Sequence, residues 1–286
     1  MQTLKTPRVS RMKARTNARH ALRAMAAVIQ RELLKFMRQS GRLFSALVRP
    51  LLWLAVFAAG FRNVFGVAIV PPYDTYIPYD VYIVPGLVGM VLLFNGMQSS
   101  LAMVYDREMG LMRLLLTAPL PRWWLLLSKL VATAVLSLLQ AAVFVAVAVA
   151  IGVDLPWQHA AQALWAASAG ALMLGAVGLL LSVHVKQLEN FAGTMNFVIF
   201  PMFFLSTALY PLWKLEEGGA RWIYLAAQGN PFTHAVEWFR FALYGKDAGG
   251  SPWVVLGVGV LCFALACRGY DPRRGFAGGG QRGASP

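Results

Sequence analysis

The chain has 286 residues, of which 58% are hydrophobic and only 13% are charged. Soluble domains have roughly 45–50% apolar and about 25% charged residues, so this composition indicates an integral membrane protein. Lysine and arginine outnumber aspartate and glutamate by 26 to 12. In so apolar a chain this excess reports membrane orientation rather than a nucleic-acid partner, and we expect no nucleic-acid binding.

Six segments approach the about 20 residues that a helix needs to cross a bilayer. These predicted spans are Leu43–Phe61, Tyr82–Val104, Leu130–Ile151, Ala160–Val183, Phe191–Leu212 and Trp253–Cys267. The last span is the shortest, so five or seven spans stay open as alternatives. The chain thus divides into a basic N-terminal segment (residues 1–42), a transmembrane domain (residues 43–267) and a tail expected to be flexible (residues 268–286).

A basic amphipathic helix is predicted directly before the first span, because apolar and basic residues there follow two separate stripes at helical spacing. The apolar stripe is Leu22, Met25, Ile29, Leu33 and Phe36, and the basic stripe is Arg31, Lys35, Arg38 and Arg42. This pattern is typical of a helix lying along the inner membrane surface, with a soluble basic helix as the alternative. Lysine and arginine are concentrated on the side that holds both chain ends, which predicts cytoplasmic termini.

Two short apolar helices are predicted between the fifth and sixth spans. "RWIYLAAQG" ends at Gly229, and "NPFTHAVEWFRFALYG" restarts with Asn230 as the N-cap and Pro231 at the first helical position. Both pieces are too apolar for free solvent, so we expect re-entrant helices that dip into the outer leaflet or lie on it. Within the fifth span, Pro201 should kink the helix and free carbonyl groups that neighbouring helices must satisfy.

Polar side chains inside the predicted spans are candidates for a substrate pathway, because polar groups in hydrocarbon are costly and often mark a translocation route. They are Asn95, Gln98, Ser99, Gln140 and Asn196. Interhelical hydrogen bonds that serve packing are the alternative for each of them. Arg49 lies inside the first span and is expected to extend its charge toward the N-terminal side.

Enzymatic and metal sites find little support in the sequence. No GxxxxGK[ST] phosphate loop occurs, so ATP is not expected to bind this chain by that route. His234 and Glu237 lie three residues apart and would suit an acid–base pair or part of a metal site, but no third ligand lies nearby. No acidic residue lies at the centre of a span, as many secondary transporters would require.

The connection between the second and third spans, "YDREMGLMRLLLTAPLPRWWLLLSK", is unusually long and charged. Residues Asp106–Thr117 contain good helix formers and no proline, which predicts a helix. The leucines and methionines among them would lie on nearly every face of that helix. A helix that is apolar on every side needs two partners, of which one is the bundle and the other should lie in the cytoplasm.

This connection resembles the cytoplasmic signature of ABC-2 type transporter permeases through Glu108, Gly110, the leucine run, Pro119, Arg122 and Lys129. It departs from the pattern at Leu111, where threonine is usual, and at Ser128, where glycine is usual. "FPMFFLSTALYPL" and "NPFTHAVEWFR" resemble the fifth-span and outer-loop motifs of the same family, particularly its drug and lipo-oligosaccharide exporter branch.

The resemblance implies an all-α integral membrane protein of the bacterial inner membrane, with an inner-surface helix, six spans and re-entrant outer helices. It implies a homodimer that contacts membrane lipids and binds a separate ATPase, which would hold ATP and Mg²⁺. This chain would then carry no cofactor, metal or catalytic residue, and would export an amphipathic, lipid-like or glycan substrate. The residues implied in ATPase coupling are Glu108, Gly110, Arg113, Pro119 and Arg122.

Three other functions stay open at this point. The first is an ATP-independent channel or secondary transporter. The second is an intramembrane enzyme that uses His234 and Glu237, and the third is a scaffold without transport activity.

Overall fold

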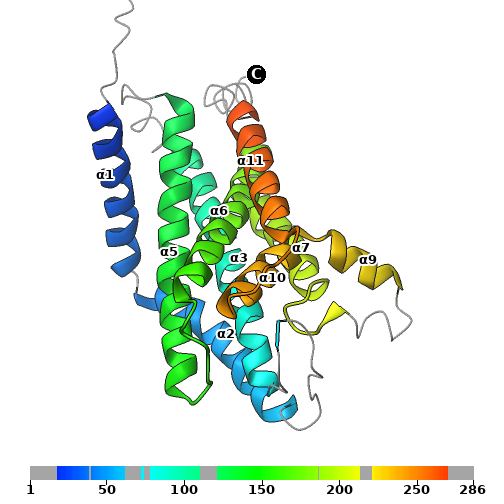
Figure 1. Ribbon diagram of the computed structural model, residues 1–286. Helices are drawn as coiled ribbons and strands as arrows, with labels where there is room; N and C mark the ends of the chain where they lie inside the picture. The colour runs from blue at the N-terminus through cyan, green and yellow to red at the C-terminus, as the bar shows by residue number, and fades with distance from the viewer. Residues whose placement is uncertain are drawn as a thin grey trace, which may run out of the picture.

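The computed structural model describes residues 18–38, 40–61, 72–73, 78–109, 121–185, 187–212 and 221–269. Regular secondary structure in these residues is α-helical, which agrees with the predicted fold class (Figure 1). The helices are α1 (Ala18–Met37), α2 (Ser40–Phe61), α3 (Tyr79–Glu108), α5 (Arg122–Ala150), α6 (Ala160–His184), α7 (Leu188–Phe204), α9 (Arg221–Gly229), α10 (Pro231–Leu243) and α11 (Ser251–Gly269).

Four of the described helices are long and apolar enough to cross a membrane, namely α3, α5, α6 and α11. The predicted sixth span, which was short in the sequence, is part of the 19-residue helix α11. By contrast, α2 has only a shorter apolar stretch, Leu47–Phe57, and α7 has 17 residues. The protein is therefore multi-pass, and the count of six spans stays a prediction.

The centre of the bundle is the contact between α3 and α6, where glycines let the two backbones approach closely. A Cβ atom on Gly96 would lie 3.2 Å from the backbone nitrogen of Gly175. A Cβ atom on Gly178 would lie 2.9 Å from the carbonyl oxygen of Gly96. Helices α5, α10 and α11 pack around this pair. Because small residues at a helix interface allow close packing, α3 and α6 form a tight unit.

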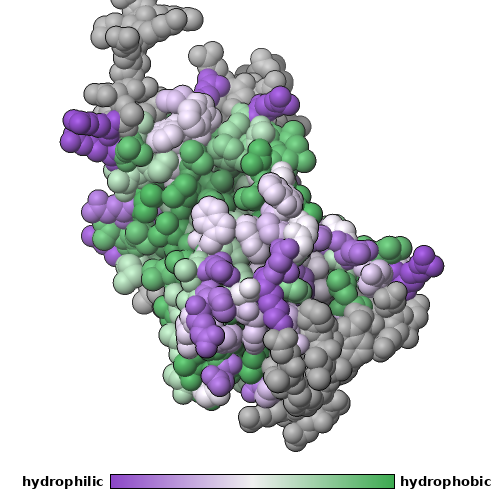
Figure 2. Space-filling model, viewed as in Figure 1, coloured by the Kyte–Doolittle hydropathy of each residue, from purple (hydrophilic) through white to green (hydrophobic). Residues whose placement is uncertain are grey.

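The predicted amphipathic helix before the first span is present as α1, which lies beside the first half of α5 (Figure 1). The indole nitrogen of Trp124 donates a hydrogen bond to the carbonyl oxygen of Ala21, 2.9 Å away. Phe36 is buried, whereas Leu22 and Met37 are exposed. Figure 2 shows hydrophilic side chains over α1 beside a hydrophobic area over α5. A location of α1 along the membrane surface stays a prediction.

The fifth predicted span is shorter than expected, because α7 ends at Phe204 instead of continuing to Leu212. Local bonds of Ser206 replace the helical ladder at this point. Its hydroxyl donates to the carbonyl oxygen of Phe203 (2.5 Å) and accepts from the backbone nitrogen of Ala208 (3.2 Å). Serine thus competes successfully with continued helix one turn after Pro201.

The two short outer helices have the predicted boundaries, with α9 ending at Gly229 and α10 beginning at Pro231. Asn230 is the N-cap of α10, as predicted, and its side-chain oxygen accepts a hydrogen bond from the backbone nitrogen of Phe232 (3.0 Å). Their position relative to the outer leaflet stays a prediction.

Candidate functional site

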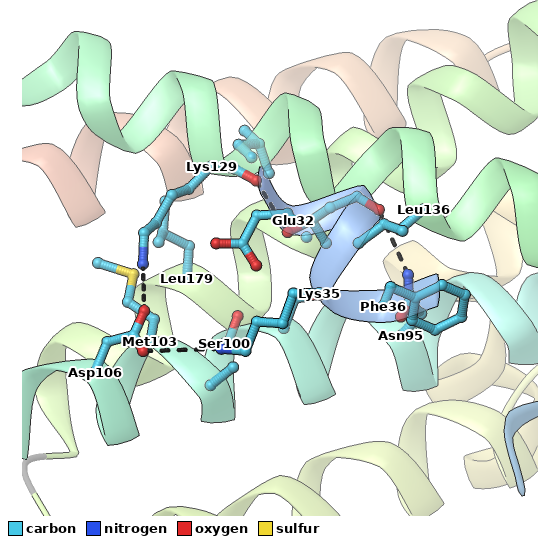
Figure 3. Close-up of a pocket in the computed structure, with 15 residues that line it drawn as sticks. Glu32, Lys35, Phe36, Asn95, Ser100, Met103, Asp106, Lys129, Leu136 and Leu179 are labelled. Atoms are coloured by element: carbon cyan, nitrogen blue, oxygen red, sulfur yellow. Dashed lines mark hydrogen bonds and ion pairs between the residues drawn. The ribbon is translucent and has the colours of Figure 1, made fainter. Parts of the chain in front are cut away.

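A buried carboxylate near the end of α3 joins three helices. The side chain of Asp106 is only 4% exposed, and its Oδ2 atom lies 3.2 Å from Nζ of Lys129 on α5. Two cations of α1 complete the cluster, with Arg31 Nη2 3.7 Å from Oδ2 and Lys35 Nζ 4.0 Å from Oδ1. Figure 3 shows Lys129 and Lys35 directed at Asp106 from different helices. This charge cluster ties α1 and α5 to the end of α3.

A small cavity of about 50 Å³ lies beside the charge cluster, between α1, α3, α5 and α6. Its polar lining consists of Glu32, Lys35, Asn95, Ser99, Ser100, Asp106, Lys129 and Thr133. A water molecule needs about 10–15 Å³ of such space, so the cavity has room for a few waters and is too small for a transported molecule.

Three of the five predicted pathway residues, Asn95, Gln98 and Gln140, line a gap between α2, α3 and α5, and Ser99 lines the cavity beside the charge cluster. The amide nitrogen of Asn95 donates to the hydroxyl of Ser137 (2.7 Å), and the amide nitrogen of Gln140 donates to the side-chain oxygen of Asn95 (3.3 Å). These interhelical bonds favour the packing interpretation for Asn95 and Gln140. Gln98 and Ser99 line the two neighbouring cavities.

The fifth predicted pathway residue, Asn196, is elsewhere. It lies on an exposed part of α7 and lines neither cavity.

The end of α3 also holds the connection between α6 and α7. Arg107 donates to the carbonyl oxygens of Ser182 (3.0 Å) and Val185 (2.7 Å) at the end of α6. Glu108 Oε1 accepts a hydrogen bond from the backbone nitrogen of Leu188 (2.8 Å), in the first turn of α7. Arginine at a helix C-terminus and glutamate at a helix N-terminus both suit the helix dipole.

The predicted coupling residues are only partly covered by the structure. Glu108 closes α3, and Arg122 opens α5 as an exposed residue. Gly110, Arg113 and Pro119 lie outside the described residues, as does most of the predicted helix Asp106–Thr117, which begins inside α3. Asp106 and Arg107 were not among the predicted site residues, although an acidic residue followed by arginine at the end of an apolar helix was a visible signal.

The side chains of Asn230 and Arg240 satisfy carbonyl groups at and beyond the end of α7. Arg240, which is 2% exposed, donates to the carbonyl oxygen of Thr207 at 2.9 Å. Asn230 donates to the carbonyl oxygens of Met202 and Leu205, each at 2.7 Å. These carbonyl groups are open because α7 ends, and the predicted kink at Pro201 stays a prediction.

Aromatic residues add to these bonds at the end of α7. We call the group formed by Asn230, Arg240, Tyr82 and the carbonyl groups that they bind the outer network, after its predicted side of the membrane. The hydroxyl of Tyr82 donates to the carbonyl oxygen of Thr207 (3.2 Å), and the Arg240 guanidinium lies 4.2 Å from the centre of the Tyr82 ring. Arg240 also forms an ion pair with Glu237. Burial raises the pKa of the neighbouring Tyr73 hydroxyl above its usual range. Arg240 was not among the predicted site residues.

Replacing Asn230 by aspartate tests this network. Asn230→Asp keeps the oxygen that caps α10 but removes both hydrogen bonds to the end of α7, and it places a charge beside two carbonyl oxygens. We expect the free energy of unfolding to fall by about 2 kcal/mol, because each of the two lost hydrogen bonds contributes roughly 1 kcal/mol. Thermal unfolding in detergent, followed by tryptophan fluorescence, measures the change. Asn190→Asp, on the exposed side of α7, is the control, and equal losses in both variants would contradict the assignment.

His234 and Glu237 do not form a pair with each other. The ring nitrogens of His234 lie 3.1 Å from the hydroxyl of Ser251 and 3.0 Å from the carbonyl oxygen of Gln228. Glu237 is engaged with Arg240. Within the described ranges, no three histidine, cysteine, aspartate or glutamate side chains gather in a group that could hold a metal ion. The geometry therefore does not favour the acid–base pair.

Comparison with known proteins identifies the family. Residues 23–244 match the model of the ABC-2 type transporter family. The chain is 28% identical over 233 residues to a protein of Porphyra purpurea named "Putative transport permease ycf38", covering 79% of this chain and 76% of that protein. The protein of the same name from Cyanophora paradoxa is 28% identical over 239 residues, with the same two coverages.

In this family the membrane subunit carries out transport and is not catalytic, and ATP is bound by a partner ATPase. The matched range includes the charge cluster, the end of α3 and the outer network. The chain therefore belongs to the ABC-2 type transporter family, as a multi-pass permease subunit.

Proposed function

We propose that this permease exports an amphipathic, lipid-like or glycan molecule across a bacterial inner membrane, as a homodimer bound to a separate ATPase and with both termini in the cytoplasm. The coupling residues would be Glu108, Gly110, Arg113, Pro119 and Arg122. The family match supports the transport role and the ATPase partner.

The observation that carries the proposal is the set of bonds at the end of α3. Residues 110–120 lie between α3 and α5, and the Asp106–Lys129 pair joins those two helices close to this connection. Arg107 and Glu108 join the same end of α3 to α6 and α7. A partner that pushes on residues 110–120 would therefore act on four helices together.

The tight α3–α6 contact supports movement of these helices as rigid bodies. Close-packed interfaces switch between discrete arrangements instead of deforming gradually. Closure of the ATPase on ATP would then turn α3 and α6 as one unit. This movement would change the side of the membrane from which the substrate can reach the helix bundle.

An exposed surface on α7 supports the homodimer. Phe197 and Phe200 on this helix are 79% and 50% exposed. The adjacent polar Asn196 is also exposed, and an amide facing lipid tails is unfavourable. A second copy at this surface would cover it.

Co-purification tests the coupling proposal. The double variant Glu108→Ala with Gly110→Pro removes the bond to Leu188 and restricts the backbone of the connection. We expect it to lose most of the ATPase from the purified complex, together with ATP-dependent transport. Glu189→Ala, at an exposed acid in the first turn of α7, is the control and should retain both. Unchanged complex formation and transport in the double variant would refute the coupling role.

A further inference from the structure

Arg49 places a permanent positive charge at mid-depth in the bundle. Its guanidinium carbon lies 4.0 Å from the centre of the Phe94 ring on α3. It lines a small gap together with Asn95 and Gln98 of α3 and Gln140 of α5. Asn95 and Gln140 lie near the centres of two helices that are long and apolar enough to span a membrane. The guanidinium is thus held at the level of Phe94, although Arg49 itself is exposed.

Arg49 differs from Arg240, the other arginine near the centre, because no acidic side chain within the described ranges forms an ion pair with it. Arg240 is buried and paired with Glu237, whereas Arg49 is exposed. The ion pairs formed within the described part of the chain involve other cations. Charges inside a bilayer are costly and are normally paired or directed into a substrate route. Stacking on Phe94 compensates only part of that cost.

The surroundings of Arg49 match one class of ligand. A guanidinium presents a planar fork of donors that fits phosphate, sulfate or carboxylate oxygens. Gln98 and Gln140 place amide groups beside it. Leu52 and Val56 follow one and two turns later on α2, and both are exposed, at 58% and 61%. An anion-binding group therefore lies next to an apolar strip along one helix.

We infer that Arg49, beside Gln98, binds the anionic group of the amphipathic molecule that the permease moves, while Leu52 and Val56 contact its apolar part. This inference rests on the proposed export function and narrows its substrate class to anionic amphipaths. Arg49 is the residue that selects the anion, because its fork supplies the charge-assisted hydrogen bonds.

Photolabelling tests the inference directly. The purified permease in a neutral maltoside detergent is labelled with dodecyl phosphate carrying a diazirine on its chain, and labelled peptides are mapped by mass spectrometry. We expect saturable labelling of peptides from α2 and α3, which excess dodecyl phosphate prevents. Arg49→Gln should lower this labelling about tenfold, the loss expected for charge-assisted bonds to one group. Arg49→Lys should retain part of it.

Two controls separate a specific site from general attraction. Arg221→Gln, at an exposed position at the start of α9, should label like the wild type. A maltoside probe with the same chain and diazirine should label all variants alike. Equal phosphate labelling of wild type and Arg49→Gln, or labelling that does not saturate, would overturn the inference. If Arg49→Gln does not give monodisperse protein, Gln98→Leu should still lower phosphate labelling, and an unchanged level would count against the site.

Transport distinguishes this inference from the proposed function. In vesicles that contain the permease–ATPase complex, ATP should drive movement of the phosphate probe by the wild type, and movement by Arg49→Gln should be about tenfold slower. A wild-type complex that moves no probe and binds no ATPase would refute the proposed function. The labelling result would still decide whether Arg49 binds anions.

Discussion

Replacing Asp106 by alanine should lower the free energy of unfolding by about 3–5 kcal/mol, the cost of removing one partner from a buried ion pair. Lys129 would stay buried, with a side chain that is only 15% exposed, and would have lost its carboxylate. Arg31 and Lys35 would lose the anion that attracts them. We expect α1 to separate from the bundle, so proteolysis should cleave it faster.

Thermal unfolding in detergent and limited trypsin digestion measure these effects. A double variant, Asp106→Leu with Lys129→Met, should recover most of the stability, because apolar residues of similar size often replace a buried ion pair without loss. Asp154→Ala, which removes an exposed carboxylate, should change the free energy by less than about 0.5 kcal/mol. Similar losses for Asp106→Ala and Asp154→Ala would mean that the charge cluster does not stabilise the fold.

Replacing Gly86 by alanine should be comparably damaging, for a steric reason. A Cβ atom on Gly86 would lie 2.1 Å from the carbonyl oxygen of Ala208 and 2.6 Å from its Cα atom. Both neighbours are backbone, so no side chain can rotate away. The turn after α7 would have to move, and the hydrogen bond from the Tyr79 hydroxyl to the carbonyl oxygen of Leu209 (2.5 Å) would be lost. We expect a loss of about 3 kcal/mol or more.

Gly193→Ala is the matched control, because a Cβ atom on Gly193 in α7 would meet no atom within 4 Å. Alanine also favours helix over glycine, so this variant should be neutral or stabilised by up to about 1 kcal/mol. The measurement is the melting temperature of both variants in the same detergent. A Gly86→Ala protein as stable as Gly193→Ala would show that the turn after α7 does not press on α3.

Helix boundaries set by local signals were predictable from the sequence. The break between α9 and α10 follows from Gly229, Asn230 and Pro231, because these residues act on their immediate neighbours. The early end of α7 was not predicted. It depends on the hydrogen bonds of Ser206, which in an apolar sequence resembles any other residue of a span.

The candidate site was predictable only in part, since it depends on which helices become neighbours. Hydrophobic periodicity shows which residues avoid water, but not which cation meets Asp106. Asn95 and Gln140 were predicted separately as pathway candidates, and the hydrogen bond between them depends on the contact of α3 with α5. Arg49 was expected to extend toward the end of its helix. Its stacking on Phe94 requires the α2–α3 contact, which one sequence does not reveal.

The outer network also sets an order for biosynthesis. The carbonyl groups at the end of α7 are satisfied by Asn230 and Arg240, residues that leave the ribosome later than α7 itself. Until then these groups have no partner from α10, and an apolar environment offers no water to replace one. The end of α7 therefore takes its final form only once residue 240 has been added, which makes the addition of α10 the step that completes this part of the protein.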